Sequence, residues 1–192
     1  MRRLYDWVLS WAETRYGTPA LALVSFTESS FFPIPPDPLL MALSLGRPKR
    51  SAVYATICTV ASVLGGLLGY WIGLEAFEYV GRPIVDFYGK HDIYQGLQAK
   101  FTEYGFLTIL TVALTPIPYK VFTIAAGSFH LDLPTFIAAS ILGRGLRFYA
   151  VGILIQCFGE PIRAFIDRYF EWLAVLFTVL LITGFLVLKR VL

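Results

Sequence analysis

Five charged side chains lie in segments that are otherwise apolar, and their types could do chemistry. Glu28 and Asp37 flank the segment FFPIPP, Lys120 follows a second Pro-Ile-Pro, and Arg144 and Arg147 share an apolar stretch. An ionisable group near the centre of a bilayer costs about 2.5 to 3.5 kcal/mol on insertion scales, so such groups are usually paired, hydrated or functional. We therefore take these five as the candidate functional residues.

The two arginines suit the binding of a phosphate. Arg144 lies ten residues past Pro134, about 15 Å along a helix, and Arg147 falls one turn later on the same face. Two guanidinium groups on one wall can hold a phosphate bidentately, with Lys120 adding a point charge. One alternative stays open, namely that the arginines neutralise Glu28 and Asp37 inside the protein. Both roles are compatible if a carboxylate exchanges for a phosphate.

Glu28 and Asp37 are assigned to proton coupling or charge pairing. An embedded carboxylate such as Glu28 could take up a proton on one face of a membrane and release it on the other. Asp37 aligns with Lys120 when the two halves of the chain are compared, so these two opposite charges could also neutralise one another.

No pattern in the chain predicts catalysis. His91 and His130 have neither a nucleophile nor metal ligands at a suitable spacing, and Cys58 and Cys157 lie in apolar stretches that indicate packing. We therefore predict no catalytic residue, no metal and no cofactor. The net charge of +3 is located mostly at segment ends, which favours contact with anionic headgroups over nucleic acid.

The composition requires a lipid solvent. Apolar residues make up 57% of the 192 residues and charged residues 15%, with a mean hydropathy of +0.66. Spanning about 30 Å of hydrocarbon takes roughly 20 apolar residues in a helix. Asp6 and Glu13 interrupt the first segment, so we expect no cleaved signal. The predicted elements are an interfacial helix over 1–15, transmembrane helices over 51–74, 133–158 and 165–188, and an interfacial connector over 75–103.

The two halves of the chain carry matching proline breaks. Residues 31–46 (FFPIPPDPLLMALSLG) are echoed by residues 114–129 (LTPIPYKVFTIAAGSF). Proline removes a backbone donor and restricts its predecessor, so a helix must stop at each break. The predicted breaks are Pro33, Pro35, Pro36, Pro116 and Pro118. Because the flanking arms are too short to cross a membrane, we predict re-entrant helical hairpins over about 18–46 and 105–130; ordinary kinks in full spans are the alternative.

These elements predict one all-α integral membrane domain over 1–192. It consists of two inverted repeats, 16–74 and 104–158, each with a re-entrant hairpin and a transmembrane helix, followed by the extra C-terminal helix. Arg47, Lys49 and Arg50 place their loop on the cytoplasmic side by the positive-inside rule. We expect a multi-pass protein of the cell inner (cytoplasmic) membrane. A homodimer is left open.

The chain resembles the DedA family of membrane proteins, and within it the YqaA-type branch. The resemblance covers about residues 16–160 and is carried by Glu28, the FFPIPPDPLL and TPIPYKVFTIAAGSF segments, and GRGLRF with Arg144 and Arg147. It implies a VTT-type fold with two oppositely oriented re-entrant hairpins. It also implies an embedded acidic pair at Glu28 and Asp37 and an essential arginine at Arg144 or Arg147. The chain departs from the family pattern at Thr115 and Lys120, where the better-studied branch has an arginine-flanked proline motif.

The function expected from this resemblance is lipid transport driven by the proton motive force. A flippase or scramblase would move a phosphate-bearing lipid, such as a phospholipid or undecaprenyl phosphate, so the expected partners are membrane lipids and protons. A proton-coupled carrier of a small ion is the alternative. An intramembrane phosphatase or transferase ranks last, because no nucleophile lies beside an acid/base group in the sequence.

Overall fold

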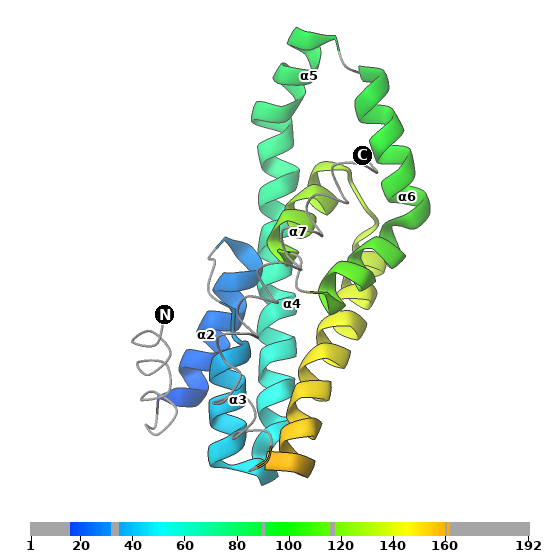
Figure 1. The fold of residues 1–192 in the computed structure, drawn as a ribbon. Helices are drawn as coiled ribbons and strands as arrows, with labels where there is room; N and C mark the ends of the chain where they lie inside the picture. The colour runs from blue at the N-terminus through cyan, green and yellow to red at the C-terminus, as the bar shows by residue number, and fades with distance from the viewer. Residues whose placement is uncertain (1–15, 32–34, 90, 116–117, 160, 162–192) are drawn as a thin grey trace.

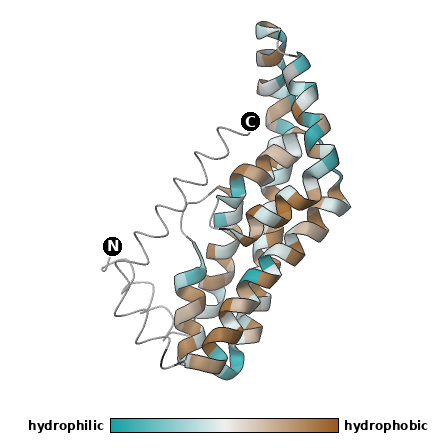
Figure 2. Ribbon diagram, turned by 45° about the vertical axis from the view of Figure 1, so that its right-hand side comes forward, coloured by the Kyte–Doolittle hydropathy of each residue, from teal (hydrophilic) through white to brown (hydrophobic). Residues whose placement is uncertain are grey.

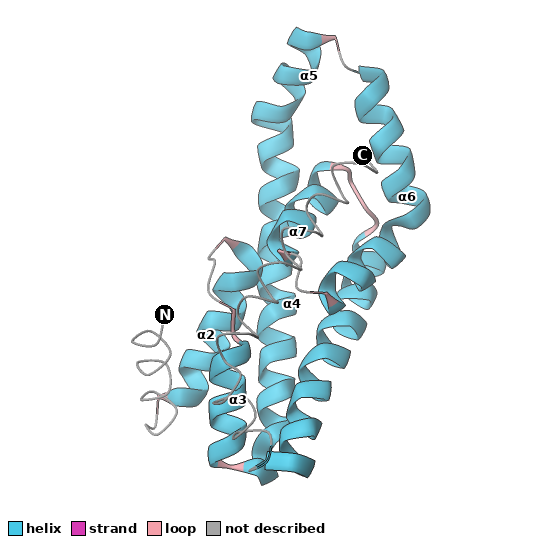
Figure 3. Cartoon of the chain, in the orientation of Figure 1, coloured by secondary structure: helices cyan, strands magenta, loops and turns pink. Residues whose placement is uncertain are grey.

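The computed structural model describes residues 16–31, 35–89, 91–115, 118–159 and 161. All the regular structure in this part of the chain is helical, which confirms the all-α prediction (Figure 3). The predicted helices over 1–15 and 165–188 and the prolines Pro33 and Pro116 lie outside the described residues.

The first half begins with two short helices on either side of the first proline break. Helix α2 covers Gly17–Ser30 and α3 covers Asp37–Gly46. Two serines of α2 donate to the carbonyl four residues earlier, Ser25 to Leu21 and Ser30 to Phe26, so their hydroxyls are satisfied inside an apolar helix. Pro36, at the start of α3, is fully buried.

The central helix is longer than the sequence predicted. A short turn η1 (Pro48–Arg50) leads into α4 (Ser51–Ala76), a π-helical turn η2 (Phe77–Gly81) and α5 (Arg82–Tyr88). We expected this helix to end at 74, but Pro83 does not end it. Pro83 has no backbone N–H, and its ring would collide with a regular α-helical turn before it. The wider π-helical turn η2 precedes Pro83 and gives the ring space, so the helix continues. The helix Pro48–Gly81 alone has 34 residues, or about 51 Å.

The second half repeats the helix–break–helix order with a longer first arm. The chain turns at Gly89, whose φ of 60° is in the left-handed region that favours glycine, and continues as α6 (His91–Leu114) and α7 (Tyr119–Ser128). The boundary expected near 103–105, between a connector and a hairpin arm, is therefore not a helix end. Residues 75–103 instead form the outer parts of two long helices, which project together from the bundle (Figure 1).

The last described helix, Leu133–Gly159, agrees with the span predicted over 133–158. This helix and Pro48–Gly81 are long and apolar enough to cross a membrane. Apolar residues dominate the middle of the bundle in Figure 2, and hydrophilic residues are more frequent on the projecting α5 and α6 end.

Glycines bring the helices into backbone contact. A Cβ on Gly65 would overlap the backbone of Phe26 in α2, and one on Gly73 would overlap the backbone of Ile124 in α7. A Cβ on Gly127 of α7 would in turn overlap the carbonyl of Tyr70 in α4. These small residues allow close helix packing, and α4 forms the spine against which α2 and α7 pack.

Candidate functional site

Arg144 is buried at the centre of the bundle, with only 2% of its surface exposed. Its guanidinium pairs with the Glu28 carboxylate of α2, and it also donates to the hydroxyls of Ser62 (2.6 Å) and Ser29 (3.1 Å). Two aromatic rings face the same guanidinium, Tyr119 of α7 and Phe148 of the last helix, each with its centroid 4.9 Å from Cζ. A buried charge needs this degree of pairing and hydrogen bonding to be tolerated.

Arg147 lies one turn further along and forms a second, more exposed pair. Its Nε and Nη2 donate to the two carboxylate oxygens of Asp37 at 3.3 and 2.9 Å, which is the bidentate geometry that arginine favours. Its Nη1 donates to the backbone carbonyl of Thr115 at 3.0 Å. The side chains of Arg147 and Asp37 are 18% and 19% exposed, compared with 3% for Arg144.

Arg147 thereby links the two proline breaks. Asp37 is the first residue of α3, directly after the first break, and Thr115 follows the last residue of α6, directly before the second. One guanidinium thus holds together two chain segments from opposite halves of the sequence. Asp37 also suits its position, because a carboxylate in the first turn of a helix is stabilised by the helix dipole.

Lys120 is not part of either pair. The suggestion that Asp37 and Lys120 neutralise one another is wrong for this conformation, because Asp37 binds Arg147. Lys120 lies in the first turn of α7, is partly exposed, and has no side-chain hydrogen bond or ion pair with any other residue that the structure describes. The alternative in which the arginines neutralise Glu28 and Asp37 is what the geometry shows, while phosphate binding stays a prediction.

Sequence reasoning missed the hydroxyl groups that support Arg144. Ser29 and Ser62 contact each other as well as Arg144, and Thr123 of α7 donates to the Ser29 carbonyl at 3.4 Å. Tyr119 donates its hydroxyl to Ser140, a turn before Arg144. The signal in the sequence was the run Glu28-Ser29-Ser30, because three consecutive polar residues are unusual within an apolar helix.

Within the described residues, no three His, Cys, Asp or Glu side chains lie close enough together to hold a metal ion. Cys58 is buried and Cys157 is exposed, and neither forms a disulfide.

Most of the chain matches a known domain. Residues 32–156 match the VTT domain, a stretch that includes Asp37, Lys120, Arg144 and Arg147. The chain belongs to the family of proteins with a VTT domain, which is the domain of DedA-type membrane proteins. This membership confirms the resemblance that the sequence motifs indicated and makes the chain a membrane-associated protein, in agreement with the two apolar spans.

Relatives in this family match almost the full chain. The chain is 33% identical over 187 residues to an uncharacterized protein of Haemophilus influenzae and 33% identical over 186 residues to one of Histophilus somni, with 97% of each chain covered in both cases. It is 25% identical over 189 residues to an alkaline phosphatase-like protein of Lactococcus lactis subsp. cremoris, covering 92% of this chain and 88% of that one. No solved structure matches the chain significantly.

Proposed function

We propose that this protein is a lipid flippase or scramblase that moves a phosphate-bearing lipid across the cytoplasmic membrane. The observation that carries the proposal is the pair of arginines, one turn apart inside a candidate span, each held by a carboxylate from the first half of the chain. A phosphate presents the same charge and bidentate oxygens as a carboxylate. It can therefore replace the carboxylate of a pair without leaving a buried guanidinium uncompensated.

The membrane placement in this proposal follows from helix lengths. Helices α3 and α7 have ten residues each, about 15 Å, which is half of a hydrocarbon core of about 30 Å. A proline break joins α3 to α2, and another joins α7 to α6. We therefore place each of these two pairs of helices in the membrane as a re-entrant hairpin, one in each of two inverted repeats. Non-helical backbone at that depth must be covered by protein or water, and Arg147 contacts a residue beside each break, Asp37 and Thr115.

The two arginines differ in a way that assigns them different roles. Arg144 has three side-chain partners and two ring contacts, so it would keep most of its environment if one partner left. Arg147 has one carboxylate and one carbonyl and is more exposed. We assign phosphate exchange to Arg147, with Lys120 as an additional cation for the headgroup, and a supporting role to Arg144.

The test is reconstitution of the full chain into vesicles that contain a fluorescent phospholipid, with quenching of the outer leaflet to follow headgroup movement. We expect Arg147→Gln to slow movement at least tenfold. Arg50→Gln is the matched control, because Arg50 is an exposed cation in the loop before α4, and we expect it to transport at the wild-type rate. Equal rates for Arg147→Gln and wild type, with both proteins folded, would refute the assignment.

A proton-coupled small-ion carrier is the second candidate, and the enclosed Glu28–Arg144 pair favours it. Proton exchange at Glu28 would release Arg144 for an anion. In protein-containing vesicles without labelled lipid, a pH gradient would then drive anion uptake, and Glu28→Gln would abolish it. Anion uptake in these vesicles, together with no headgroup movement in the vesicles that contain the fluorescent phospholipid, would select this candidate over lipid transport.

The name of the Lactococcus relatives raises phosphate ester hydrolysis as a further alternative. Hydrolysis shares the requirement for a phosphate site but adds a nucleophile and an acid/base group. Release of inorganic phosphate from the reconstituted lipid, measured in the same vesicles, distinguishes hydrolysis from movement of the intact headgroup.

A further inference from the structure

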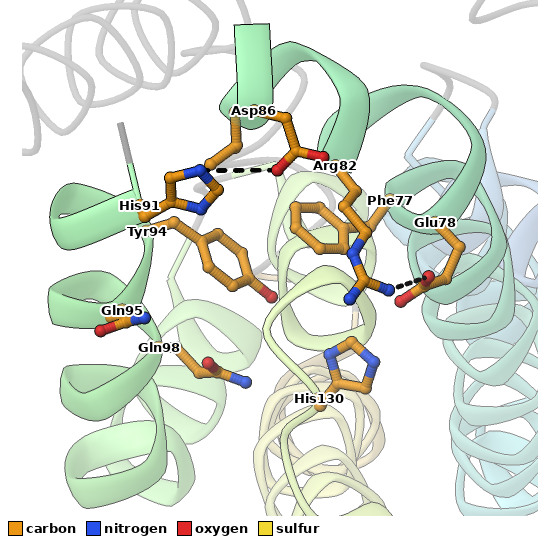
Figure 4. A pocket seen from close by; sticks show the side chains of 10 residues that line it. Phe77, Glu78, Arg82, Asp86, His91, Tyr94, Gln95, Gln98 and His130 are labelled. Carbon is orange, nitrogen blue, oxygen red and sulfur yellow. Dashed lines mark hydrogen bonds and ion pairs between the residues drawn. The ribbon is translucent and has the colours of Figure 1, made fainter. Parts of the chain in front are cut away.

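A polar pocket lies away from the arginine pairs, at the base of the projecting helices (Figure 4). It has a volume of about 340 Å³ and lies between η2, α5, α6 and the turn after α7. Its charged and polar lining includes Glu78, Arg82, Asp86, His91, Gln98 and His130. The transport proposal does not use these residues.

His130 stands in a position where glycine is the favoured residue. Its φ is 56°, the one positive φ of a non-glycine residue in the described chain. The amide of His130 donates to the Gly127 carbonyl and that of Leu131 to the Ala126 carbonyl, which is the Schellman arrangement at the end of α7. Any residue with a side chain strains the backbone in this conformation. The presence of a histidine here therefore indicates that its imidazole has a function beyond ending the helix.

The pocket presents both signs of charge. At the rim, Arg82 pairs with Glu78 at 2.9 Å and His91 pairs with Asp86 at 3.6 Å. The bond between Arg82 and Glu78 joins one N–H of the guanidinium to one carboxylate oxygen, so both groups can bind a further ligand. In Figure 4 the Arg82 guanidinium extends toward His130 on the opposite wall. Cationic and anionic groups therefore lie around one hollow.

The depth of the pocket corresponds to a lipid headgroup layer. Phe77 in its wall directly follows α4, whose 26 residues extend about 39 Å from Ser51. A whole bilayer with its headgroups is about 40 to 45 Å thick. With the basic loop before Ser51 at one surface, the pocket reaches the opposite surface. This placement rests on the membrane orientation in the proposed function.

We propose that this pocket binds a zwitterionic headgroup, with the phosphate at Arg82 and His130 and the ammonium at Asp86 and Glu78. A purely anionic ligand would face two carboxylates, and a simple cation would face the guanidinium, whereas a phosphate joined to an ammonium satisfies both. The phosphate accepts hydrogen bonds from the guanidinium and the Gln98 amide, and the ammonium donates to the carboxylates. The bound group is the headgroup of a membrane lipid at the surface opposite the Arg47–Arg50 loop.

The test measures binding of glycerophosphoethanolamine to the purified full chain in detergent by titration calorimetry. Glycerophosphoglycerol and inorganic phosphate serve as the anionic comparisons. We expect the zwitterion to bind at least tenfold more tightly than either. Asp86→Asn should weaken binding of the zwitterion and strengthen that of glycerophosphoglycerol, because one carboxylate that repels an anion is gone. Equal affinity for inorganic phosphate, or no binding of the zwitterion, would overturn the proposal.

His130→Gly separates binding from folding. Glycine is favoured at this backbone position, so the variant should melt at or above the wild-type temperature while its affinity for the zwitterion falls at least tenfold. Arg82→Gln should show the same loss, and Lys100→Gln, an exposed cation of α6 outside the pocket, should bind normally. Wild-type affinity in His130→Gly would refute the pocket. Arg147→Gln should keep full affinity, so a failure of the transport proposal is distinguishable from a failure of this one.

Discussion

Replacing Glu28 with glutamine should destabilise the protein strongly, because it leaves the Arg144 charge buried without its counter-ion. Glutamine has nearly the same shape, so the change removes a charge and little packing. Removing one partner of a buried ion pair typically costs about 3 to 5 kcal/mol. Arg144 keeps the hydroxyls of Ser29 and Ser62 and the two ring contacts, so we expect the lower end, about 3 kcal/mol.

The chain offers a matched control for this change. Glu78 pairs with Arg82 on the projecting end, where the side chains are 43% and 63% exposed, compared with 16% and 3% for Glu28 and Arg144. Glu78→Gln is the same chemical change in a solvated pair, and exposed helix pairs contribute only about 0.3 to 0.5 kcal/mol. The two variants therefore carry the same substitution and differ in how deeply the affected ion pair is buried.

The measurement is the free energy of unfolding by sodium dodecyl sulfate in mixed micelles, followed by circular dichroism. The double variant Glu28→Gln with Arg144→Met, in which both charges are absent, should recover part of the loss, because the uncompensated guanidinium is gone. If Glu28→Gln and Glu78→Gln lower the unfolding free energy equally, the burial argument is wrong. A double variant that is as unstable as the sum of the single ones would also contradict it.

Three further perturbations test the packing and the topology. Gly73→Ala should destabilise the protein by about 1 to 3 kcal/mol, because the new methyl group separates α4 from α7. Gly96→Ala places its methyl group in open space and should stabilise α6 by up to about 1 kcal/mol. Thermal melting in detergent compares the two variants. Tyr119→Phe should cost about 1 kcal/mol in the same unfolding assay, since the buried bond to Ser140 is lost. Cysteines introduced at Phe87 and Lys49 should react with an impermeant maleimide from opposite sides of oriented vesicles, and labelling from one side would contradict the orientation.

The positions of the helix breaks could be predicted from the sequence because proline acts locally. Proline lacks a backbone donor and its ring collides with the preceding turn whatever packs nearby, and α2 and α6 end just before the Pro-Ile-Pro segments. The same reasoning failed at Pro83. There the helix continues through the π-helical turn η2, and the Phe77 ring in this turn stacks on Tyr94 of α6, a long-range contact that the local sequence does not reveal.

The charged residues of the site were identifiable, but their partners were not. A charge in an apolar segment can be recognised from one sequence, because the residue types alone reveal it. Which carboxylate meets which arginine depends on how α2 and the last helix pack on α4. Contacts such as Gly65 with Phe26 and Gly152 with Ser51 bring these helices together, and they join residues far apart in the sequence. The alignment of Asp37 with Lys120 compared equivalent positions in the repeats, and equivalent positions need not be neighbours.

The difference in exposure between the two pairs also fixes the order in which they can open. Arg147 is 18% exposed and Arg144 only 3%, so the Asp37–Arg147 pair is the less enclosed of the two and should separate first. Its opening also releases Thr115, since the same guanidinium holds both proline breaks. The Arg144 guanidinium is enclosed more completely and keeps α2, α4 and the last helix joined through Ser29 and Ser62. A headgroup that displaces Asp37 would therefore part the two breaks from each other while the interior of the bundle stays closed around Arg144.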